Sequence, residues 1–292
     1  YPDGLLYGVV DQPPQRRGMG FTTAAALDWL DEALAGDAPW CGVVSFTEPH
    51  DPFVCGREAF AQYDVDAVEL PANVHDPLEG RPNLYRKAAR AYDAMTDRQH
   101  REAAACYWAL TTECDQQFGR VIDRVERAGQ LDNTLVIVIS DHGDFLGAHG
   151  MYCKNVGPWE EAFHVPLIFS GSGAASGAVS DARVGSHEIA PTLLEMLGLE
   201  PIGAPDSRSF APAVADPAGR SGDYTTGFAE YEGARFHYTQ RVAWDGPWKF
   251  VFNAFDNDEL YHLDDDPGEL RNRIADPQCR DVVKRMMALM WR

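Results

Sequence analysis

The densest group of potential metal ligands in the sequence is the run at residues 140–150, SDHGDFLGAHG. A carboxylate next to an imidazole, here Asp141 and His142, can bind a divalent cation, and carboxylate-rich sites favour Ca²⁺, Mg²⁺ or Mn²⁺. Three glycines in the same run allow the backbone to fold tightly around such an ion. The spacing alone leaves a second interpretation open, in which Asp141 caps a turn and the side chain of His142 is solvated.

Two further side chains have types that suit chemistry at such a site. Lys154 follows the run, and a lysine beside a metal loop of an acidic protein can bind an anionic substrate, although most lysines are simply exposed. His50 lies in a proline-flanked loop, PHDP. An imidazole there could donate a proton near neutral pH or hydrogen-bond a charged oxygen, and Asp51 would favour its charged form if the two side chains approach. A single loop histidine is more often incidental.

Both candidate loops directly follow a predicted strand. Residues 134–139, TLVIVI, are apolar without alternation, which is typical of a central parallel strand covered on both faces. Residues 40–46, WCGVVSF, precede His50 and predict another buried strand. Ligands of parallel α/β sheets bind at the carboxyl ends of the strands. We therefore expect His50 and the 140–150 run to lie in one crevice.

Helices and strands alternate along the first two-thirds of the chain, which predicts an α/β fold. A strand is predicted over residues 165–169, and the helix at 21–34 is expected to be capped by Thr22 or Thr23. The predicted helices cover residues 21–34, 98–127, 189–197 and 280–291. The predicted C-terminal strands cover residues 227–230, 236–244, 248–252 and 260–263. We expect a mostly parallel mixed sheet flanked by helices in a domain over residues 1–203, and a small antiparallel α+β subdomain over residues 204–292.

The composition argues against several classes of protein. A net charge of −20 disfavours a nucleic-acid partner, and a sulfate or phosphate site would need a local positive charge such as a bound cation. No run is apolar over the roughly 18 residues that a membrane span needs. The six cysteines form no C-x-x-C pair, so we expect free buried thiols, which mildly favours a reducing, cytoplasmic compartment. The sequence leaves association into a homo-oligomer open.

Segments in the same order along the chain resemble the motifs of type I sulfatases, in the alkaline phosphatase superfamily. Residues 132–154 are similar to the family pattern of DNT, an apolar strand, SDHG, LG, HG and a lysine. The other matching segments are residues 45–53 (SFTEPHDPF), 160–168 (EEAFHVPLI), 186–194 (SHEIAPTLL), 248–250 (WKF) and 259–269 (ELYHLDDDPGE). The same pattern resembles phosphonate monoester hydrolases and phosphodiesterases, so it defines the family better than the substrate.

The resemblance implies roles for the matching residues. Asp141 and His142 match two metal ligands, and we expect Ca²⁺, with Mn²⁺ or Mg²⁺ as alternatives. Lys154 matches the lysine that holds a sulfate or phosphoryl oxygen, and His50 matches the histidine near the leaving-group oxygen. The implied site thus combines a metal, a fixed positive charge and a proton donor.

Other positions support or depart from the family pattern. Asp144 and His149 match motif positions that we place around the metal ligands as supporting residues. His164 stands where the family has an arginine, so the partner of that arginine is expected to differ. No cysteine or serine has the C/S-x-P-x-R context that yields the formylglycine nucleophile, and the family's early Asp-Asp metal pair is also missing. We expect both in a preceding N-terminal segment.

The expected function is metal-dependent hydrolysis of a sulfate monoester by the complete protein, on a small molecule or a saccharide. One alternative is a phosphonate monoester or phosphodiester hydrolase that uses the same residues. Another is a truncated, non-catalytic fragment that binds at most a metal or a partner. The natural substrate is not predicted, because irregular loops usually form the pocket wall that selects the alcohol.

Overall fold

The computed structural model describes residues 5–154, 156–203, 206–233, 237–254 and 256–291. It is a mixed α/β fold with an antiparallel C-terminal sheet, as expected. The helices are α1 (Gly18–Ala35), α2 (Arg57–Phe60), α3 (Asn83–Ala89), α4 (Asp97–Arg127), α5 (Glu160–Phe163), α6 (Ile189–Met196), α7 (Ala211–Ala215), α8 (Pro217–Arg220) and α9 (Arg280–Met290). The strands are β1 (Tyr7–Val10), β2 (Phe53–Gly56), β3 (Val136–Ile139), β4 (Leu167–Ser170), β5 (Thr226–Tyr231), β6 (Gln240–Asp245), β7 (Trp248–Asn253) and β8 (Glu259–His262).

The chain forms two compact units, which we describe one at a time. The first consists of Tyr1–Val74, Ala91–Thr134 and Asp144–Cys153, and the second of His75–Arg90, Leu135–Gly143 and Lys154–Arg292. The expected division between residues 203 and 204 stays a prediction. No helix of the described residues combines the length and the apolar character needed to cross a membrane.

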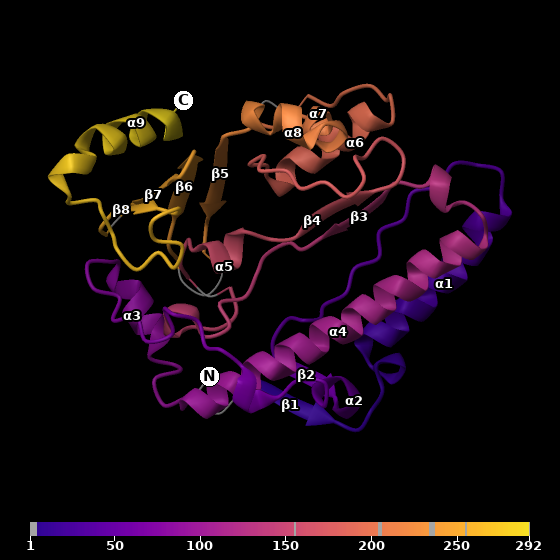
Figure 1. Cartoon of the computed structure of the whole chain (residues 1–292), viewed down its shortest axis with the longest axis horizontal. Helices are drawn as coiled ribbons and strands as arrows, with labels where there is room; N and C mark the ends of the chain where they lie inside the picture. The colour runs from indigo at the N-terminus through magenta and orange to yellow at the C-terminus, as the bar shows by residue number, and fades with distance from the viewer. Residues whose placement is uncertain (1–4, 155, 204–205, 234–236, 255, 292) are drawn as a thin grey trace. The chain divides into compact units, whose positions relative to one another are not determined.

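Helix α4 organises the first unit. It begins with a capping box, in which Thr96 accepts a hydrogen bond from the backbone of Gln99 and the Gln99 side chain accepts one from the backbone of Thr96. Its apolar face packs on the parallel strands β1 and β2, and α1 runs alongside it (Figure 1). Helix α1 begins at Gly18, earlier than predicted, and no side chain caps it. Thr23 instead donates to the carbonyl of Met19 inside the helix, so the expected threonine cap is wrong.

The predicted strand at residues 40–46 is not formed. Val43 is 91 % exposed, and Cys41 is exposed, whereas the other five cysteines are buried free thiols as expected. A strand needs a neighbouring strand to satisfy its backbone hydrogen bonds, and the described residues provide none for this segment. Trp40 instead packs edge-on against Trp29 of α1, with ring centroids 5.9 Å apart.

In the second unit β3 pairs with β4, in the register that joins Val136 to Ser170. Both strands occur close to their predicted positions, but the pairing is antiparallel, and β3 is only half-buried. The expectation of a parallel strand covered on both faces is therefore wrong for β3 in the described residues. Helices α6 and α7 lie beside this pair, where Phe169 of β4 packs edge-on against Phe210 (Figure 1).

The antiparallel sheet β5-β6-β7-β8 forms the C-terminal part of the second unit, as predicted. Phe236, where the second of its strands was expected to start, lies outside the described residues. Helix α9 packs on β6 and β7 and buries Met286 against Ala243, Phe250 and Leu260. Both faces of this sheet are covered: α9 packs on one, and at alternate positions Val242, Trp244 and Val251 form a second buried cluster with Phe163.

Candidate active site

The loop after β3 fixes the tautomer of His142. The ring Nδ1 lies 2.8 Å from the carbonyl oxygen of Gly143. Because a carbonyl oxygen only accepts hydrogen bonds, Nδ1 carries the proton and Nε2 presents its lone pair. Metal-binding histidines commonly donate their other ring N–H to a carbonyl or carboxylate in this way. The local geometry therefore suits His142 as a ligand through Nε2.

Asp141 and Lys154 both lie next to Nε2 of His142. The Asp141 Oδ2 atom is 3.6 Å from Nε2, and the Lys154 Nζ atom is 3.0 Å from it. Asp141 also accepts a hydrogen bond from the backbone of His142, yet its side chain is 85 % exposed, while that of His142 is 24 % exposed. Asp141 thus does accept the hydrogen bond of a turn cap, but His142 is not simply solvated. Three of the side chains predicted for the site, those of Asp141, His142 and Lys154, lie close together.

This donor set fits a metal site in part. An exposed carboxylate oxygen lies near the imidazole Nε2 atom, and that nitrogen already contacts a positive charge, the ammonium group of Lys154. Within the described ranges no three His, Cys, Asp or Glu side chains are grouped to hold a metal. Asp141 and His142 would therefore supply two ligands of a larger set.

Asp144 and His149 make hydrogen bonds in and around the segment between His142 and Lys154. Asp144 Oδ1 accepts hydrogen bonds from the backbone N–H groups of Leu146 (2.8 Å) and Cys153 (3.0 Å). His149 is buried with a left-handed backbone (φ 54°), and its Nε2 lies 3.0 Å from the side-chain amide of Asn73. Gly147 in this segment also has a positive φ, which favours glycine. The supporting role that we predicted for both residues remains a prediction.

Replacing Asp144 by alanine is expected to destabilise the protein by about 1–3 kcal/mol, because two backbone N–H groups lose their acceptor. Asp144→Asn is the matched control, since its side-chain oxygen can still accept. Urea denaturation of both variants measures the change in the free energy of unfolding. Equal losses for alanine and asparagine would show that these hydrogen bonds do not hold the segment.

His50 lies in the first unit, at the start of the segment that leads into β2. Its Nδ1 is 3.0 Å from Asp51 Oδ1, so the two side chains approach, which the sequence left open. The ring is 40 % exposed. Asp141, His142 and Lys154 belong to the second unit. The expected common crevice and the general-acid role of His50 stay predictions.

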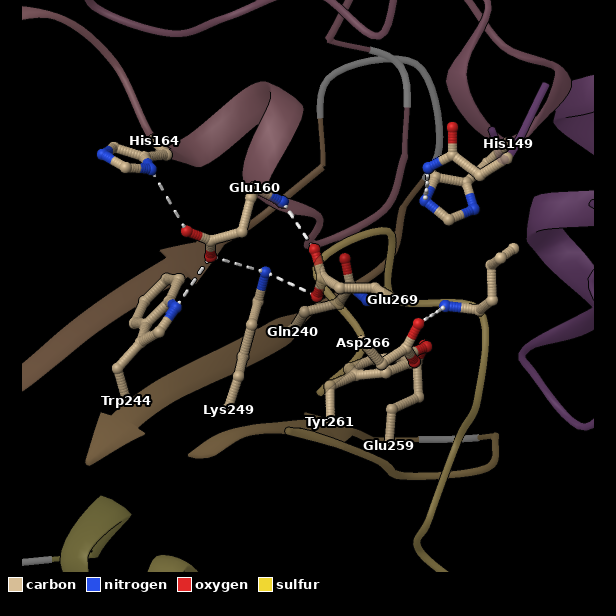
Figure 2. Close-up of polar contacts among 12 residues, drawn as sticks. His149, Glu160, His164, Gln240, Trp244, Lys249, Glu259, Tyr261, Asp266 and Glu269 are labelled. Atoms are coloured by element: carbon tan, nitrogen blue, oxygen red, sulfur yellow. Dashed lines mark hydrogen bonds and ion pairs between the residues drawn. The ribbon is translucent and has the colours of Figure 1, made fainter. Parts of the chain in front are cut away.

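A buried charge cluster that sequence reasoning missed lies in the second unit (Figure 2). Lys249 of β7 is fully buried, and its Nζ lies 3.0 Å from Glu160 Oε1 and 2.8 Å from Glu269 Oε1. Glu160 also accepts a hydrogen bond from the indole of Trp244 (2.9 Å), and its backbone N–H donates to Glu269 (2.7 Å). The available signal was that Glu160, Lys249 and Glu269 all lie in segments that carry the family resemblance.

The cluster holds a charged lysine between two carboxyl groups with different proton affinities. Burial raises the pKa of Glu269 to about 7, against the opposing effect of Lys249. For Glu160, burial is outweighed by Lys249 and by the hydrogen bonds from Trp244 and Lys249, so its pKa is lowered. For Lys249, burial is outweighed by Glu269 and Glu160, so its pKa is raised. These three groups therefore depend on one another for their ionised forms.

His164, which replaces the arginine of the family pattern, contacts the same cluster. Its Nδ1 lies 3.5 Å from Glu160 Oε2, and its side chain is 80 % exposed (Figure 2). The partner at this position is thus Glu160. Because the ring is exposed to solvent, we assign little stability to this contact.

Comparison with known proteins identifies the family. The Sulfatase family model matches residues 10–199, and the model "N-sulphoglucosamine sulphohydrolase, C-terminal" matches residues 147–292. The chain belongs to the sulfatase family. The chain is 30 % identical over 262 residues to the uncharacterized sulfatase YidJ of Escherichia coli (strain K12), a match that covers 89 % of the chain and 52 % of the relative. It is 31 % identical over 248 residues to the choline-sulfatase of Rhizobium meliloti (strain 1021), which covers 82 % of the chain and 47 % of the relative.

Solved structures show the fold of this sulfatase to be that of the alkaline phosphatase superfamily. The phosphonate monoester hydrolase SpPMH from Silicibacter pomeroyi matches with a TM-score of 0.81 and 26 % identity, over 96 % of the chain and 60 % of the neighbour. BT4656, solved in complex with its substrate D-glucosamine-2-N,6-O-disulfate, matches with a TM-score of 0.79 and 21 % identity, over 94 % of the chain and 68 % of the neighbour. The chain spans about half the length of the two curated relatives named above.

Proposed function

We propose that the complete protein hydrolyses sulfate monoesters of small molecules or saccharides in a metal-dependent reaction. The observation that carries this proposal is the grouping of Asp141, His142 and Lys154 around one imidazole nitrogen, on the loop after β3. Membership of the sulfatase family supports it, and so does the similarity, 27 % over 233 residues, to the N-acetylglucosamine-6-O-sulfatase of Bacteroides thetaiotaomicron.

Each residue has a distinct task in this proposal. Asp141 and His142 hold the metal, for which Ca²⁺ fits the carboxylate best and Mn²⁺ or Mg²⁺ are alternatives. When bound, the metal supplies positive charge against the sulfate oxygens. Lys154 holds a sulfate oxygen by its ammonium group, and His50 gives a proton to the departing alcohol oxygen. The nucleophile is a formylglycine supplied by a segment outside this sequence.

Replacing Asp141 by alanine in the full-length protein is expected to remove most of its bound metal. Losing an outer-shell partner already costs about 10–100-fold in metal affinity, and a direct ligand contributes more. Elemental analysis and calorimetric titration with Ca²⁺ measure the effect. Asp281→Ala, at an aspartate of α9 whose side chain is 97 % exposed, is the control and should leave metal content unchanged. Full metal content in Asp141→Ala would refute the ligand assignment.

Phosphonate monoester hydrolysis is the second candidate, because of the structural match to SpPMH. Paired sulfate and phosphonate monoesters of one phenol separate the two activities, since the leaving group is the same in both. We expect a higher kcat/KM for the sulfate ester. A higher value for the phosphonate ester would favour the second candidate.

A further inference from the structure

The loop that carries Asp141 and His142 lies directly on helix α5. The Gly143 N–H donates to the carbonyl oxygen of Ala162 at 2.8 Å. A Cβ atom on Gly143 would lie 1.9 Å from the carbonyl oxygen of Glu161, so only glycine permits this approach of loop and helix. Because the two backbones touch, a shift of α5 would move the loop with it.

Helix α5 cannot hold its own position. It spans the single turn Glu160–Phe163, and an isolated helix this short is unstable in water. Its first residue, Glu160, is instead held through both its backbone and its side chain (Figure 2). The backbone N–H donates to Glu269, and the carboxylate contacts Lys249 and the indole of Trp244. The position of α5 is therefore set by the buried charge cluster.

The other members of the cluster are rigidly placed. Lys249 is in β7, where it pairs with Trp244 of β6 on one side and Tyr261 of β8 on the other. Glu269 is fully buried, with a positive φ of 49°, and its backbone N–H donates to the carbonyl of Asp266. An unbroken series of contacts thus runs from the antiparallel sheet through Glu160 and α5 to the loop of His142.

We propose that Lys249 and Glu269 are positioning residues for the pair Asp141 and His142, and that they act through Glu160 and α5. The proposal depends on the proposed function only in taking that pair as metal ligands. It means that the C-terminal sheet and the segment after it contribute to metal affinity through residues that are not themselves assigned as ligands. Losing a direct hydrogen-bond partner of a metal ligand commonly costs about 10–100-fold in affinity, and we expect the lower end of this range for residues that act through α5.

The test uses the full-length protein with Lys249→Met and Glu269→Gln combined. Lys249→Met alone leaves two buried carboxylates without their cation and is expected to impair folding. The double variant removes one charge of each sign, and neutral groups of similar size often replace a buried ion pair at little cost in stability. Glu160 loses its cation but is 22 % exposed and keeps the hydrogen bond from Trp244. Arg208→Met combined with Glu188→Gln is the matched control, because it removes another ion pair of a buried carboxylate in the same unit. Trp244→Phe is a milder second variant, because it keeps every charge of the cluster; it removes the indole hydrogen bond to Glu160 and reduces the ring that lies against Phe163 and Lys249.

Two measurements separate positioning from general stability. Hydrogen exchange measures the exchange rate of the Gly143 N–H, which is hydrogen-bonded to the carbonyl oxygen of Ala162. We expect this rate to rise at least about tenfold in the double variant. Titration with Ca²⁺ should show a dissociation constant raised by about tenfold or more. In Trp244→Phe both changes should be smaller, and the control variant should match the wild type in both.

The outcomes distinguish this inference from the proposed function. Unchanged Gly143 exchange in the folded double variant, or in Trp244→Phe if the double variant does not fold, would overturn the positioning role. Faster exchange with an unchanged Ca²⁺ dissociation constant would overturn it as well, since the loop would then not set metal affinity. If the wild type binds no Ca²⁺ while Gly143 exchange accelerates in the variant, positioning of the loop is supported and the metal assignment fails.

Discussion

His50→Ala in the full-length protein is expected to lower kcat/KM for alkyl and sugar sulfates by about 10²–10⁴-fold, the usual value of general-acid help. Cleavage of the ester S–O bond leaves negative charge on the departing oxygen. A nitrophenol leaving group tolerates that charge without a proton, whereas an alkyl or sugar alcohol does not. The loss for activated aryl sulfates should therefore be much smaller.

The measurement for His50 is kcat/KM across sulfate esters with graded leaving-group pKa. His237→Ala, at another exposed histidine of the chain, is the matched control and should leave the whole series unchanged. Asp51→Asn is informative as well, because it keeps a hydrogen-bond acceptor beside the His50 ring but removes the charge 3.0 Å away. Equal losses across the series for His50→Ala would leave His50 as a sulfate-binding or structural residue.

Lys154→Ala is expected to slow alkyl and aryl sulfates alike, by about 10²–10³-fold in kcat, the range found when one donor to a developing oxyanion is removed. The ammonium group lies 3.0 Å from Nε2 of His142, which we propose as a metal ligand. It would therefore stabilise the transferring sulfuryl group, whose charge does not depend on the leaving alcohol. In the same ester series, the logarithm of kcat should fall by the same amount at every leaving-group pKa.

Lys154→Arg provides the control for charge at this position. It keeps the positive charge but changes the shape of the donor, so a partial recovery of activity is expected. Metal affinity should be measured in the same samples, because Lys154 also contacts His142. A loss that grows with leaving-group pKa would contradict the assignment and place Lys154 on the leaving-group side.

Local patterns predicted the elements whose stability is itself local. Helix α4 follows from its periodic apolar face, and the C-terminal sheet follows from a series of short strand-like segments. The segment at 40–46 has an equally apolar pattern, yet it forms no strand in the described residues. Strand formation depends on a hydrogen-bonded neighbour distant in sequence, and no pattern within seven residues can supply that neighbour.

The sequence by itself determined the family and named the side chains of the candidate site. Asp141, His142 and Lys154 lie within fourteen residues of one another, so motif spacing sufficed, and the structure brings the three together. Their proximity is largely a consequence of chain connectivity around one glycine-rich loop.

Only the tertiary structure decided which charged residues are buried. Lys249 and Glu269 are residue types that are almost never fully buried unless they are paired, and nothing in the sequence indicated a buried pairing for either. Their partner Glu160 is 89 residues from Lys249 and 109 residues from Glu269, and the three meet only because β7 and the start of α5 fold together. The mutual contacts that favour the charged forms of Lys249 and Glu160, against the cost of burial, exist only in the folded chain.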